Sequence, residues 1–218
     1  MRVSIICSNV EHPVGPYLEV WKKAQEGNGH KVDILSQSTD VVSGDILFLV
    51  SCSERIPQHV RNRFKHVLVL HASDLPKGRG WSPYIWDILS GEDEIVLSLI
   101  EAEDQIDTGK IWKKTRVLIS KTHLYDELNQ VLFQAEVSLM SWAVENYKTV
   151  MPAEQDRNVE PTYWPRRTVQ DSRLDINKTL AEQFDLLRVC DPIRYPAFFE
   201  INGRKYKLTL DRFDEEKN

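Results

Sequence analysis

The stretch Gly44-Asp45-Ile46-Leu47-Phe48-Leu49-Val50-Ser51 holds an unbroken apolar run that ends in a small polar residue. An apolar run of this length is typical of a strand that is buried on both faces. Further strand-like runs lie at Val3–Cys7 and Lys31–Ser36 before it, and at Val67–Leu70 after it. Because buried strands must be covered on both faces, these runs predict a central sheet packed between other elements.

Segments with helical spacing separate the strand-like runs. The first helix-spaced face consists of Tyr17, Val20, Trp21 and Ala24. Gly27 or Gly29 marks the end of that helix, and Ile56–Phe64 is a second helix-spaced segment. Strands that alternate with helices are typical of α/β proteins, so we expect a mostly parallel, Rossmann-like sheet with helices on both faces.

The pattern continues to residue 147 and then changes. Two more strands are predicted at Ile95–Ile100 and Ile111–Ile119. The apolar stripe of a long helix follows, at Leu124, Leu128, Val131, Leu132, Ala135, Leu139 and Trp142. We interpret this stripe as core packing. Since the composition then becomes polar, we expect a catalytic domain over residues 1–150, and a linker with a small C-terminal subdomain over residues 151–218.

A short helix and a hairpin are predicted in the C-terminal subdomain. Thr179 and Glu182 have the spacing of a capping box, which predicts a short helix at that point. The segments Ala197–Ile201 and Lys205–Leu210 are joined by Asn202-Gly203, a dipeptide typical of tight β-hairpins.

The composition is that of an ordinary soluble globular protein, with 41% hydrophobic and 28% charged residues. No apolar run approaches the length of a membrane span, and the N-terminus lacks a signal-peptide pattern, so we expect a cytoplasmic protein. A net charge of −5 with scattered basic residues argues against general nucleic-acid binding. The three cysteines and six separated histidines predict reduced thiols and no metal site.

Ligands of parallel sheets bind beyond the carboxyl ends of the strands. This rule selects the loops Ser8–Gly15, Ser51–Pro57 and His71–Pro83. The third loop reads His71-Ala72-Ser73-Asp74-Leu75-Pro76-Lys77-Gly78-Arg79-Gly80-Trp81-Ser82-Pro83. A histidine there can donate a hydrogen bond or move a proton, and glycines let a ligand approach the backbone closely. Lys77 and Arg79 can bind an anionic group.

A second polar loop lies between the two strands predicted after residue 94. It reads Asp104-Gln105-Ile106-Asp107-Thr108-Gly109. Taken alone, it is an ordinary acidic turn, because aspartate and glycine favour turns.

Together, the two loops resemble the signature of the formyltetrahydrofolate-dependent formyltransferases. The shared pattern is His-x-Ser-x-Leu-Pro-x-x-x-Gly, a helix, a strand and then Ile-Asp-Thr-Gly. The resemblance covers roughly residues 1–147 by order of elements, and the run Gly44–Ser51 followed by Ile56-Pro57 matches as well. It implies 10-formyltetrahydrofolate as the formyl donor.

The resemblance also implies the site residues. His71 and Asp107 would be the catalytic pair, with His71 donating to the formyl oxygen and Asp107 accepting the proton that the amine loses. The implied folate-binding residues are Ser51, Cys52, Ser53, Glu54, Arg55, Ile56, Asp104 and Ile106. The substrate-binding residues that we infer are Ser73, Lys77, Arg79, Tyr195 and Phe198.

One position departs from the family pattern. The family places an asparagine two residues before the histidine as a second donor to the formyl oxygen, and this chain has Val69 there. Losing one such donor typically costs about two to three orders of magnitude in rate. We expect a replacement, with Asn9 as the first candidate and Ser73 or an ordered water as others.

The C-terminal part of the sequence indicates which kind of molecule accepts the formyl group. Thr162–Asp175 and Asp191–Phe199 resemble the segment that follows the catalytic domain in sugar-nucleotide and methionyl-tRNA formyltransferases. The histidine loop is most similar to that of N-formyltransferases for pseudaminic-acid-type sugars. The resemblance therefore implies a nucleotide-linked amino sugar, such as a UDP-4-amino-4,6-dideoxy sugar, as acceptor, and a homodimer.

Three other functions are considered. A methionyl-tRNA formyltransferase and a ribonucleotide formyltransferase are disfavoured by the acidity, the length and the tail segment. A catalytically silent folate- or nucleotide-binding homologue is favoured only by Val69.

Overall fold

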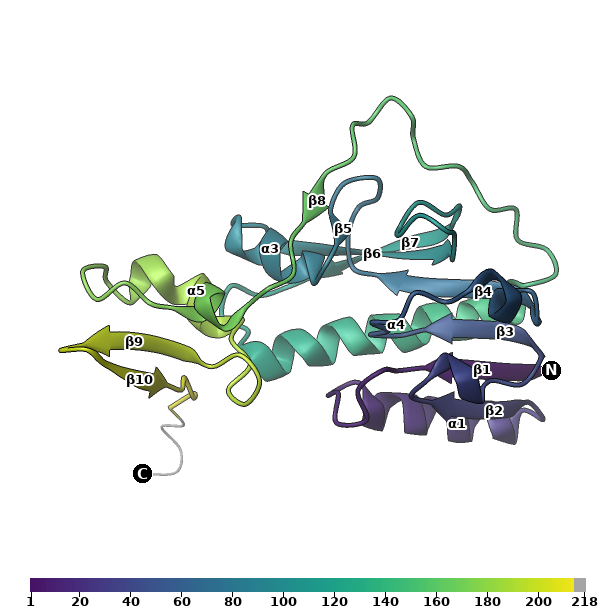
Figure 1. Ribbon diagram of the computed structural model, residues 1–218, viewed down its shortest axis with the longest axis horizontal. Helices are drawn as coiled ribbons and strands as arrows, with labels where there is room; N and C mark the ends of the chain where they lie inside the picture. Colours follow the sequence, from purple (N-terminus) through teal and green to yellow (C-terminus); the bar gives the residue numbers. More distant parts are fainter. Residues whose placement is uncertain (214–218) are drawn as a thin grey trace.

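The computed structural model describes residues 1–213. Its central sheet has the strand order β2-β1-β3-β4-β6-β7 (Figure 1). These strands are β1 (Arg2–Ile6), β2 (Lys31–Leu35), β3 (Gly44–Leu49), β4 (Phe64–His71), β6 (Glu94–Glu101) and β7 (Ile111–Leu118). The first four strands run parallel, whereas β6 is antiparallel to both β4 and β7. The predicted α/β fold with a mostly parallel sheet is confirmed.

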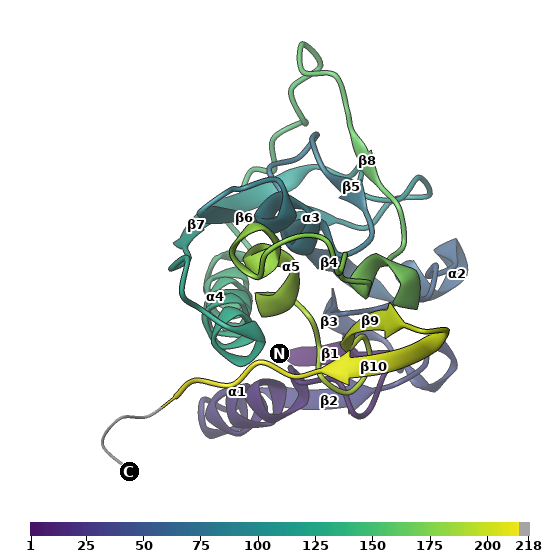
Figure 2. The ribbon, with the colours of Figure 1, turned by 90° about the vertical axis from the view of Figure 1, so that its left-hand side faces the viewer.

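Helices cover both faces of the sheet, and unequally. Helices α1 (Gly15–Gly27) and α4 (Tyr125–Asn146) pack side by side on one face, and the four-residue helix α2 (Gln58–Arg61) lies on the other (Figure 2). The other helical segments are η1 (Ser38–Asp40), α3 (Pro83–Leu89), η2 (Val169–Ser172), η3 (Ala181–Gln183) and α5 (Phe184–Arg188). The thinly covered face leaves room for long loops, and these loops build the site.

Alternate residues of each strand feed two apolar cores. Val3, Ile5 and Phe48 belong to the larger core under α1 and α4. Ile6 and Leu49 point to the opposite face and join the smaller core, together with residues of the loops and of α2. This alternation follows from the pleat of the strand, and it places His71 on the face opposite α4, since its neighbours Leu70 and Ala72 belong to the larger core.

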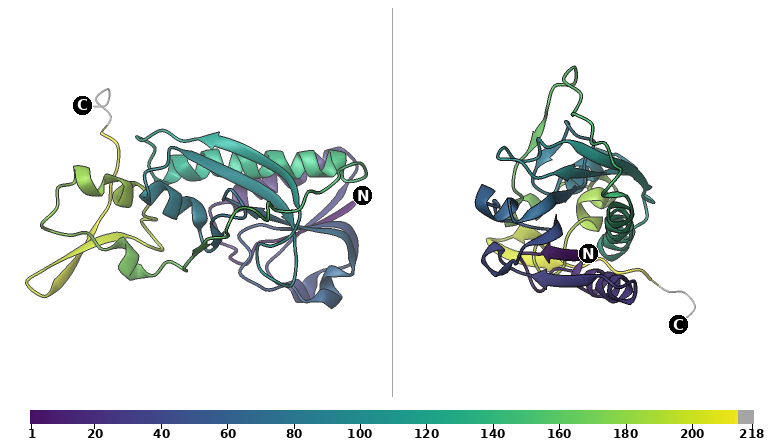
Figure 3. Two further views of the ribbon diagram at one scale, coloured as in Figure 1. Left: turned by 90° about the horizontal axis from the view of Figure 1, so that it is seen from above. Right: turned by 90° about the vertical axis from the view of Figure 1, so that its right-hand side faces the viewer.

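The chain that follows α4 crosses to the thinly covered face. Seen from above, it runs over the strands (Figure 3, left). There β8 (Tyr163–Trp164) pairs in parallel with β5 (Arg79–Gly80), which lies in the loop after β4. We call residues 152–165, which include β8, the strap.

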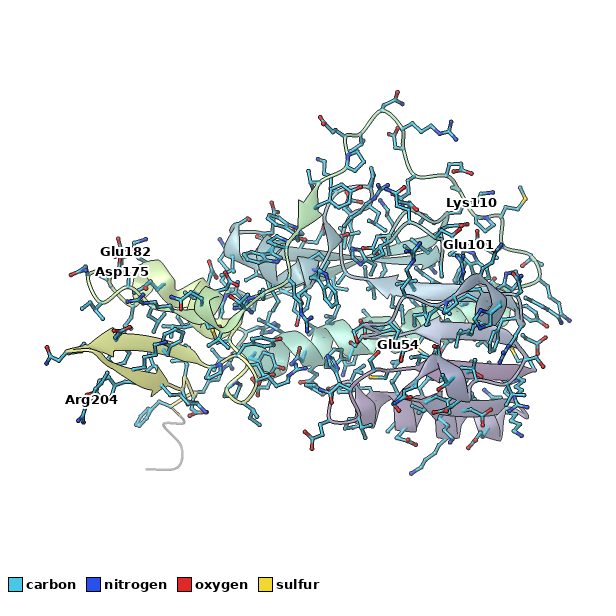
Figure 4. All side chains as sticks on the ribbon, in the orientation of Figure 1. Glu54, Glu101, Lys110, Asp175, Glu182 and Arg204 are labelled. Atoms are coloured by element: carbon cyan, nitrogen blue, oxygen red, sulfur yellow. The ribbon has the colours of Figure 1, made fainter. Side chains whose placement is uncertain are left out.

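The C-terminal unit lies beyond the carboxyl ends of the parallel strands (Figure 1). Strands β9 (Ala197–Ile201) and β10 (Arg204–Leu208) form the predicted antiparallel hairpin, and Asn202 and Gly203 both have positive φ, at 50° and 74°. The predicted capping box also forms, because Thr179 N–H and Glu182 N–H bind each other's side chains at 2.7 and 3.2 Å. Figure 4 labels Asp175, Glu182 and Arg204 on this unit. The division into two domains stays a prediction.

Two helix predictions were wrong in detail. The buried face of α1 consists of Leu18, Trp21 and Gln25, and Val20 is 70% exposed. The hydrogen bond from Trp21 Nε1 to Ser141 Oγ of α4, at 2.9 Å, sets this rotation of the helix.

The segment Ile56–Phe64 is helical only over Gln58–Arg61. A residue before proline is disfavoured in helical conformation, so Ile56 stays in the loop before Pro57. Phe64 already begins β4. Among the helices of residues 1–213, none is long and apolar enough to span a membrane.

Candidate active site

His71 is the last residue of β4, and its side chain is 7% exposed. Its Nε2 lies 2.9 Å from the carbonyl oxygen of Gly78, seven residues further along the loop. A carbonyl oxygen can only accept a hydrogen bond, so Nε2 carries a proton here. This contact fixes the orientation of the ring and leaves Nδ1 to face the site.

Asp107 faces His71 from the β6–β7 loop. Asp107 Oδ1 lies 3.5 Å from His71 Nδ1, and both side chains are 7% exposed. The backbone N–H of Gly80 donates to Asp107 Oδ2 at 2.8 Å. The structure therefore brings together the two residues that the sequence motifs identify, and the histidine loop itself orients the carboxylate.

The β6–β7 loop reaches His71 by folding back over the sheet. Because β6 runs antiparallel to β4, this loop starts near the middle of β4, where Glu101 pairs with Leu68. The N–H of Ala102 then donates to Val67 O at 2.8 Å. Asp107 itself has the left-handed φ of 58°, a conformation that aspartate tolerates better than most residues. The turn is what points its carboxylate at the histidine.

Gln155 of the strap holds this turn. Its Nε2 donates to Asp107 O at 2.8 Å and to Gly109 O at 3.0 Å, and its Oε1 accepts from Arg79 Nη2 at 2.7 Å. The residue is 9% exposed. Sequence reasoning missed Gln155, because a polar residue in a polar segment is typical of an exposed linker.

The rest of the strap closes over the histidine loop. The N–H of Gly78 donates to Thr162 Oγ1 at 2.8 Å, and Trp81 N–H donates to Trp164 O at 3.2 Å. Gly80 is required between them, because its φ is 102° and a Cβ atom there would lie 2.4 Å from Trp164 O. The rings of Trp86 and Trp164 stack with centroids 5.6 Å apart. The loop that follows His71 is thus anchored by a segment far away in sequence.

The two loops predicted to bind folate lie side by side on the same face. Arg55 Nη2 donates to Asp104 O at 2.9 Å, and Arg61 donates to Ala102 O at 2.9 Å and pairs with Asp104. Figure 4 shows Glu54 on the first loop and Glu101 and Lys110 at the ends of the second. The structure brings these predicted residues together.

Their chemistry suits a heterocycle that is bound through backbone groups. The backbone amides of Cys52, Arg55 and Ile56 make no hydrogen bond within residues 1–213. Ile106, 61% exposed, adds an apolar side chain at the rim. Val69, at the position of the family asparagine, packs with Cys52 against the smaller core. Free amides beside apolar side chains fit the polar edge and the flat face of a pterin.

The two side chains predicted as replacements for the family asparagine, Asn9 and Ser73, have different surroundings in the structure. Asn9 is exposed, and its Oδ1 accepts the N–H of Glu11 at 3.0 Å. No hydrogen bond within the described part of the chain joins Asn9 to His71 or Asp107. Ser73, by contrast, is 1% exposed, and its Oγ has no hydrogen-bond partner among those residues. A Cβ on Gly78 would meet that Oγ at 3.4 Å, so the free hydroxyl lies close to the loop that holds His71.

The inferred substrate-binding residues do not share one surface. Lys77 is exposed, but Arg79 is 8% exposed, and its guanidinium donates to Gln155 and to Tyr163 Oη. Phe198 is 7% exposed, with Lys205 Nζ 5.4 Å from its ring centroid. Tyr195 is partly buried, and its carbonyl accepts from Ser172. Arg79 and Phe198 make packing contacts in this structure, and their binding of substrate stays a prediction.

The fold and the two loops define a formyl transferase domain. The sequence pattern of the formyl transferase family matches residues 10–144, and the chain belongs to that family. A methionyl-tRNA formyltransferase of Protochlamydia amoebophila (strain UWE25) is 30% identical over 173 residues, which cover 77% of this chain and 54% of that protein. The chain thus spans about half the length of this curated relative.

Solved structures of the same fold include formyltransferases and the protein HypX. A methionyl-tRNA formyltransferase from Clostridium thermocellum superposes with a TM-score of 0.82 at 21% identity, covering 98% of this chain and 94% of that one. A 4-N formyltransferase from Francisella tularensis gives 0.76 at 17% identity, covering 98% of both chains. HypX from Aquifex aeolicus in complex with tetrahydrofolic acid gives 0.79 at 18% identity, covering 96% of this chain and 37% of that one.

Proposed function

We propose that the chain is a cytoplasmic N-formyltransferase that moves a formyl group from 10-formyltetrahydrofolate to the amine of a nucleotide-linked amino sugar. The observation that carries this proposal is the buried pair His71 and Asp107, held 3.5 Å apart in a chain of the formyl transferase family. Bound between the two folate loops, the donor would supply the carbonyl carbon that the amine attacks.

Proton transfer is the chemistry that the pair supports. Since Nε2 of His71 already donates to Gly78 O, its Nδ1 and the Asp107 carboxylate are the groups that face an incoming amine. They would accept the proton that the amine loses as the new C–N bond forms. The bond between the formyl carbon and N10 of the donor would then break, and tetrahydrofolate would leave with that proton on N10. We propose His71 as the proton carrier, because its Nε2 is bound to Gly78 O in this structure. Donation from His71 to the formyl oxygen, which the resemblance implies, stays a prediction.

Ser73 is the better candidate for the donor to the formyl oxygen. Its hydroxyl is buried, has no partner within residues 1–213 and lies near the Gly78 backbone. A hydroxyl in a water-poor site stabilises a developing negative charge more strongly than it would in water. We therefore propose that Ser73 compensates for Val69.

The acceptor is proposed from the tail and from the charge. The segment Thr162–Asp175, which resembles that of sugar-nucleotide and methionyl-tRNA formyltransferases, contains the residues that close the histidine loop, and that loop is most similar to the loop of the sugar enzymes. A net charge of −5 disfavours a partner bound through many phosphates. Methionyl-tRNA is the second candidate acceptor, because the curated relatives at up to 30% identity are methionyl-tRNA formyltransferases.

A product assay tests the proposal. Purified protein is incubated with 10-formyltetrahydrofolate and a panel of UDP- and dTDP-linked amino sugars, and products are examined by mass spectrometry for one added formyl group. Initiator methionyl-tRNA is assayed in parallel. We expect one sugar nucleotide to gain the group, and His71→Ala and Asp107→Asn to abolish the product.

Each other outcome points elsewhere. Formylation of the tRNA alone would establish the second candidate. Folate binding, measured by fluorescence, without transfer to either acceptor class would indicate a silent homologue. A homodimer stays a prediction that sedimentation velocity can test.

A further inference from the structure

Arg167 is a buried arginine that makes no ion pair within residues 1–213. It follows the strap directly and is 8% exposed. Nη2 donates a single hydrogen bond, to Ser172 Oγ at 3.3 Å. The Nε atom has no partner within residues 1–213, and the guanidinium makes no ion pair there. Because burying an unpaired charge is costly, this side chain lacks an anion.

The fold does provide partners for another buried arginine. Arg188, 2% exposed, pairs with Asp185 at 2.6 Å and donates to Ser120 O and His123 O. The carboxylate nearest to Arg167 in sequence, that of Asp171, makes no ion pair with it within residues 1–213, since Oδ2 accepts the N–H and the hydroxyl of Thr168. These hydrogen bonds lower the pKa of Asp171, and the positive charge of Arg167 lowers it further.

The phenol of Tyr84 is buried. Burial raises the pKa of this phenol, and the positive charges of Arg194 and Arg167 act against that rise. Tyr84 is therefore a neutral donor at pH 7. Its hydroxyl donates to Asn129 Oδ1 at 3.4 Å, a long contact that a better acceptor could replace.

Two further buried carboxyl groups, those of Asp191 and Glu136, make no ion pair with Arg167 within residues 1–213. Asp191 is paired with Arg194 and accepts from Tyr125 Oη at 2.8 Å. Glu136 of α4 is 6% exposed, and burial raises its pKa to about 8, so it is largely protonated at pH 7. The charge of Arg167 thus stays available to a ligand.

Arg167 also lies close to the histidine loop. Helix α3, which carries Tyr84, begins three residues after Gly80, whose N–H binds Asp107. Trp86 of α3 donates to Pro165 O at 3.1 Å, two residues before Arg167. An anion on Arg167 would therefore be anchored beside the loop that follows His71 and binds Asp107.

We propose that Arg167 anchors the diphosphate of a nucleoside diphosphate. This inference rests on the proposed function and names the phosphate contact of the same acceptor. A guanidinium offers two parallel N–H groups that match phosphate oxygens. We assign the contact with phosphate to Arg167 and not to Arg79, because the Arg79 guanidinium already donates to Gln155 and Tyr163.

Calorimetric titration of the full chain with UDP and with dTDP tests this inference. The variant is Arg167→Gln, and the matched control is Arg166→Gln, which removes the same charge one residue away, where the guanidinium is exposed and lies over the Trp81 ring. We expect at least about tenfold weaker binding in Arg167→Gln, from the loss of a charge-assisted contact, and less than about threefold in Arg166→Gln.

A melting curve without ligand separates a ligand anchor from a structural arginine. Removal of an unpaired buried charge should leave the thermal midpoint of Arg167→Gln unchanged or raised, whereas loss of a structural contact would lower it. Absence of nucleotide binding to the native chain, equal affinity in both variants, or a clearly lowered midpoint would overturn the inference.

The formyl-transfer assay is independent of this test. Nucleotide binding that depends on Arg167 without any transfer would sustain the anchor and refute the proposed reaction. Sugar formylation that is insensitive to Arg167→Gln would support the proposed reaction and refute the role of Arg167 as the phosphate anchor.

Discussion

Gln155 Nε2 donates to the backbone carbonyl of Asp107 at 2.8 Å, so a residue beyond the matched family region supports the catalytic turn. The same carboxamide binds Gly109 O and the Arg79 guanidinium. The turn it supports has a left-handed φ at Asp107, and such a conformation persists only where neighbouring contacts hold it. The His71–Asp107 geometry therefore depends on the strap.

Replacing Gln155 by leucine should lower kcat by about tenfold or more. The change removes two buried hydrogen bonds to the turn and leaves the Arg79 guanidinium without its acceptor, and each such loss costs about 1–3 kcal/mol. Because the turn orients the base, kcat should fall more than the KM for folate rises. The control is Glu154→Gln, at an exposed neighbour. Unchanged kcat in a folded Gln155→Leu protein would contradict the positioning role.

Gly80→Ala should loosen the strap and reduce activity. The added Cβ would lie 2.4 Å from Trp164 O, and the φ of 102° is unfavourable for alanine. We expect a loss of stability above about 1 kcal/mol and faster proteolysis within residues 152–165. Gly91→Ala is the matched control, since its φ is 95° and no atom lies within 4 Å of its Cβ position. Equal losses of stability in the two variants would show that the positive φ causes the effect and that the contact with Trp164 does not.

Ser73→Ala should lower the rate more than Asn9→Ala does. The Ser73 hydroxyl is buried without a partner near the histidine loop, whereas Asn9 is exposed and binds Glu11. If Ser73 donates to the formyl oxygen, its loss should cost about two orders of magnitude in kcat. Single-turnover kinetics of both variants measures this, and the opposite order would restore Asn9 as the replacement donor.

Glu136→Gln should make the stability less sensitive to pH. Burial raises the pKa of Glu136 from 4.5 to about 8 in the folded protein, so the folded state binds this proton more tightly than the unfolded state does. Its contribution to stability is therefore present below about pH 4.5 and is lost as pH rises toward 8.

Glutamine cannot ionise, so the variant should become more stable than the native protein as pH rises from 5 to 8. The expected gain is a few kcal/mol, because each pKa unit of the shift corresponds to about 1.4 kcal/mol. Urea unfolding at several pH values measures the difference. Glu145→Gln, at an exposed position of the same helix, is the control. A pH-independent difference for Glu136→Gln would show that its pKa is not raised.

The sequence by itself determined the sheet, the hairpin and the two loops that carry His71 and Asp107. Buried strands leave unbroken apolar runs such as Ile46–Val50, and a tight hairpin needs residues that accept positive φ, as Asn202 and Gly203 do. The His71 and Asp107 loops were found because their motifs are local and their residue types are specific. In each case neighbours in sequence decide the conformation.

Only the tertiary structure decided how the site is held. The carboxyl-end rule does not predict that the loop after antiparallel β6 folds back to His71, or that Gln155, from a polar segment that resembles a linker, secures it. Arg79 and Arg167 look alike in sequence, yet Arg79 is bound by Gln155 and Tyr163 while Arg167 is left without an anion. The function of a polar side chain depends on which partners contact it in the folded chain. Such long-range contacts produce no periodic pattern in the sequence.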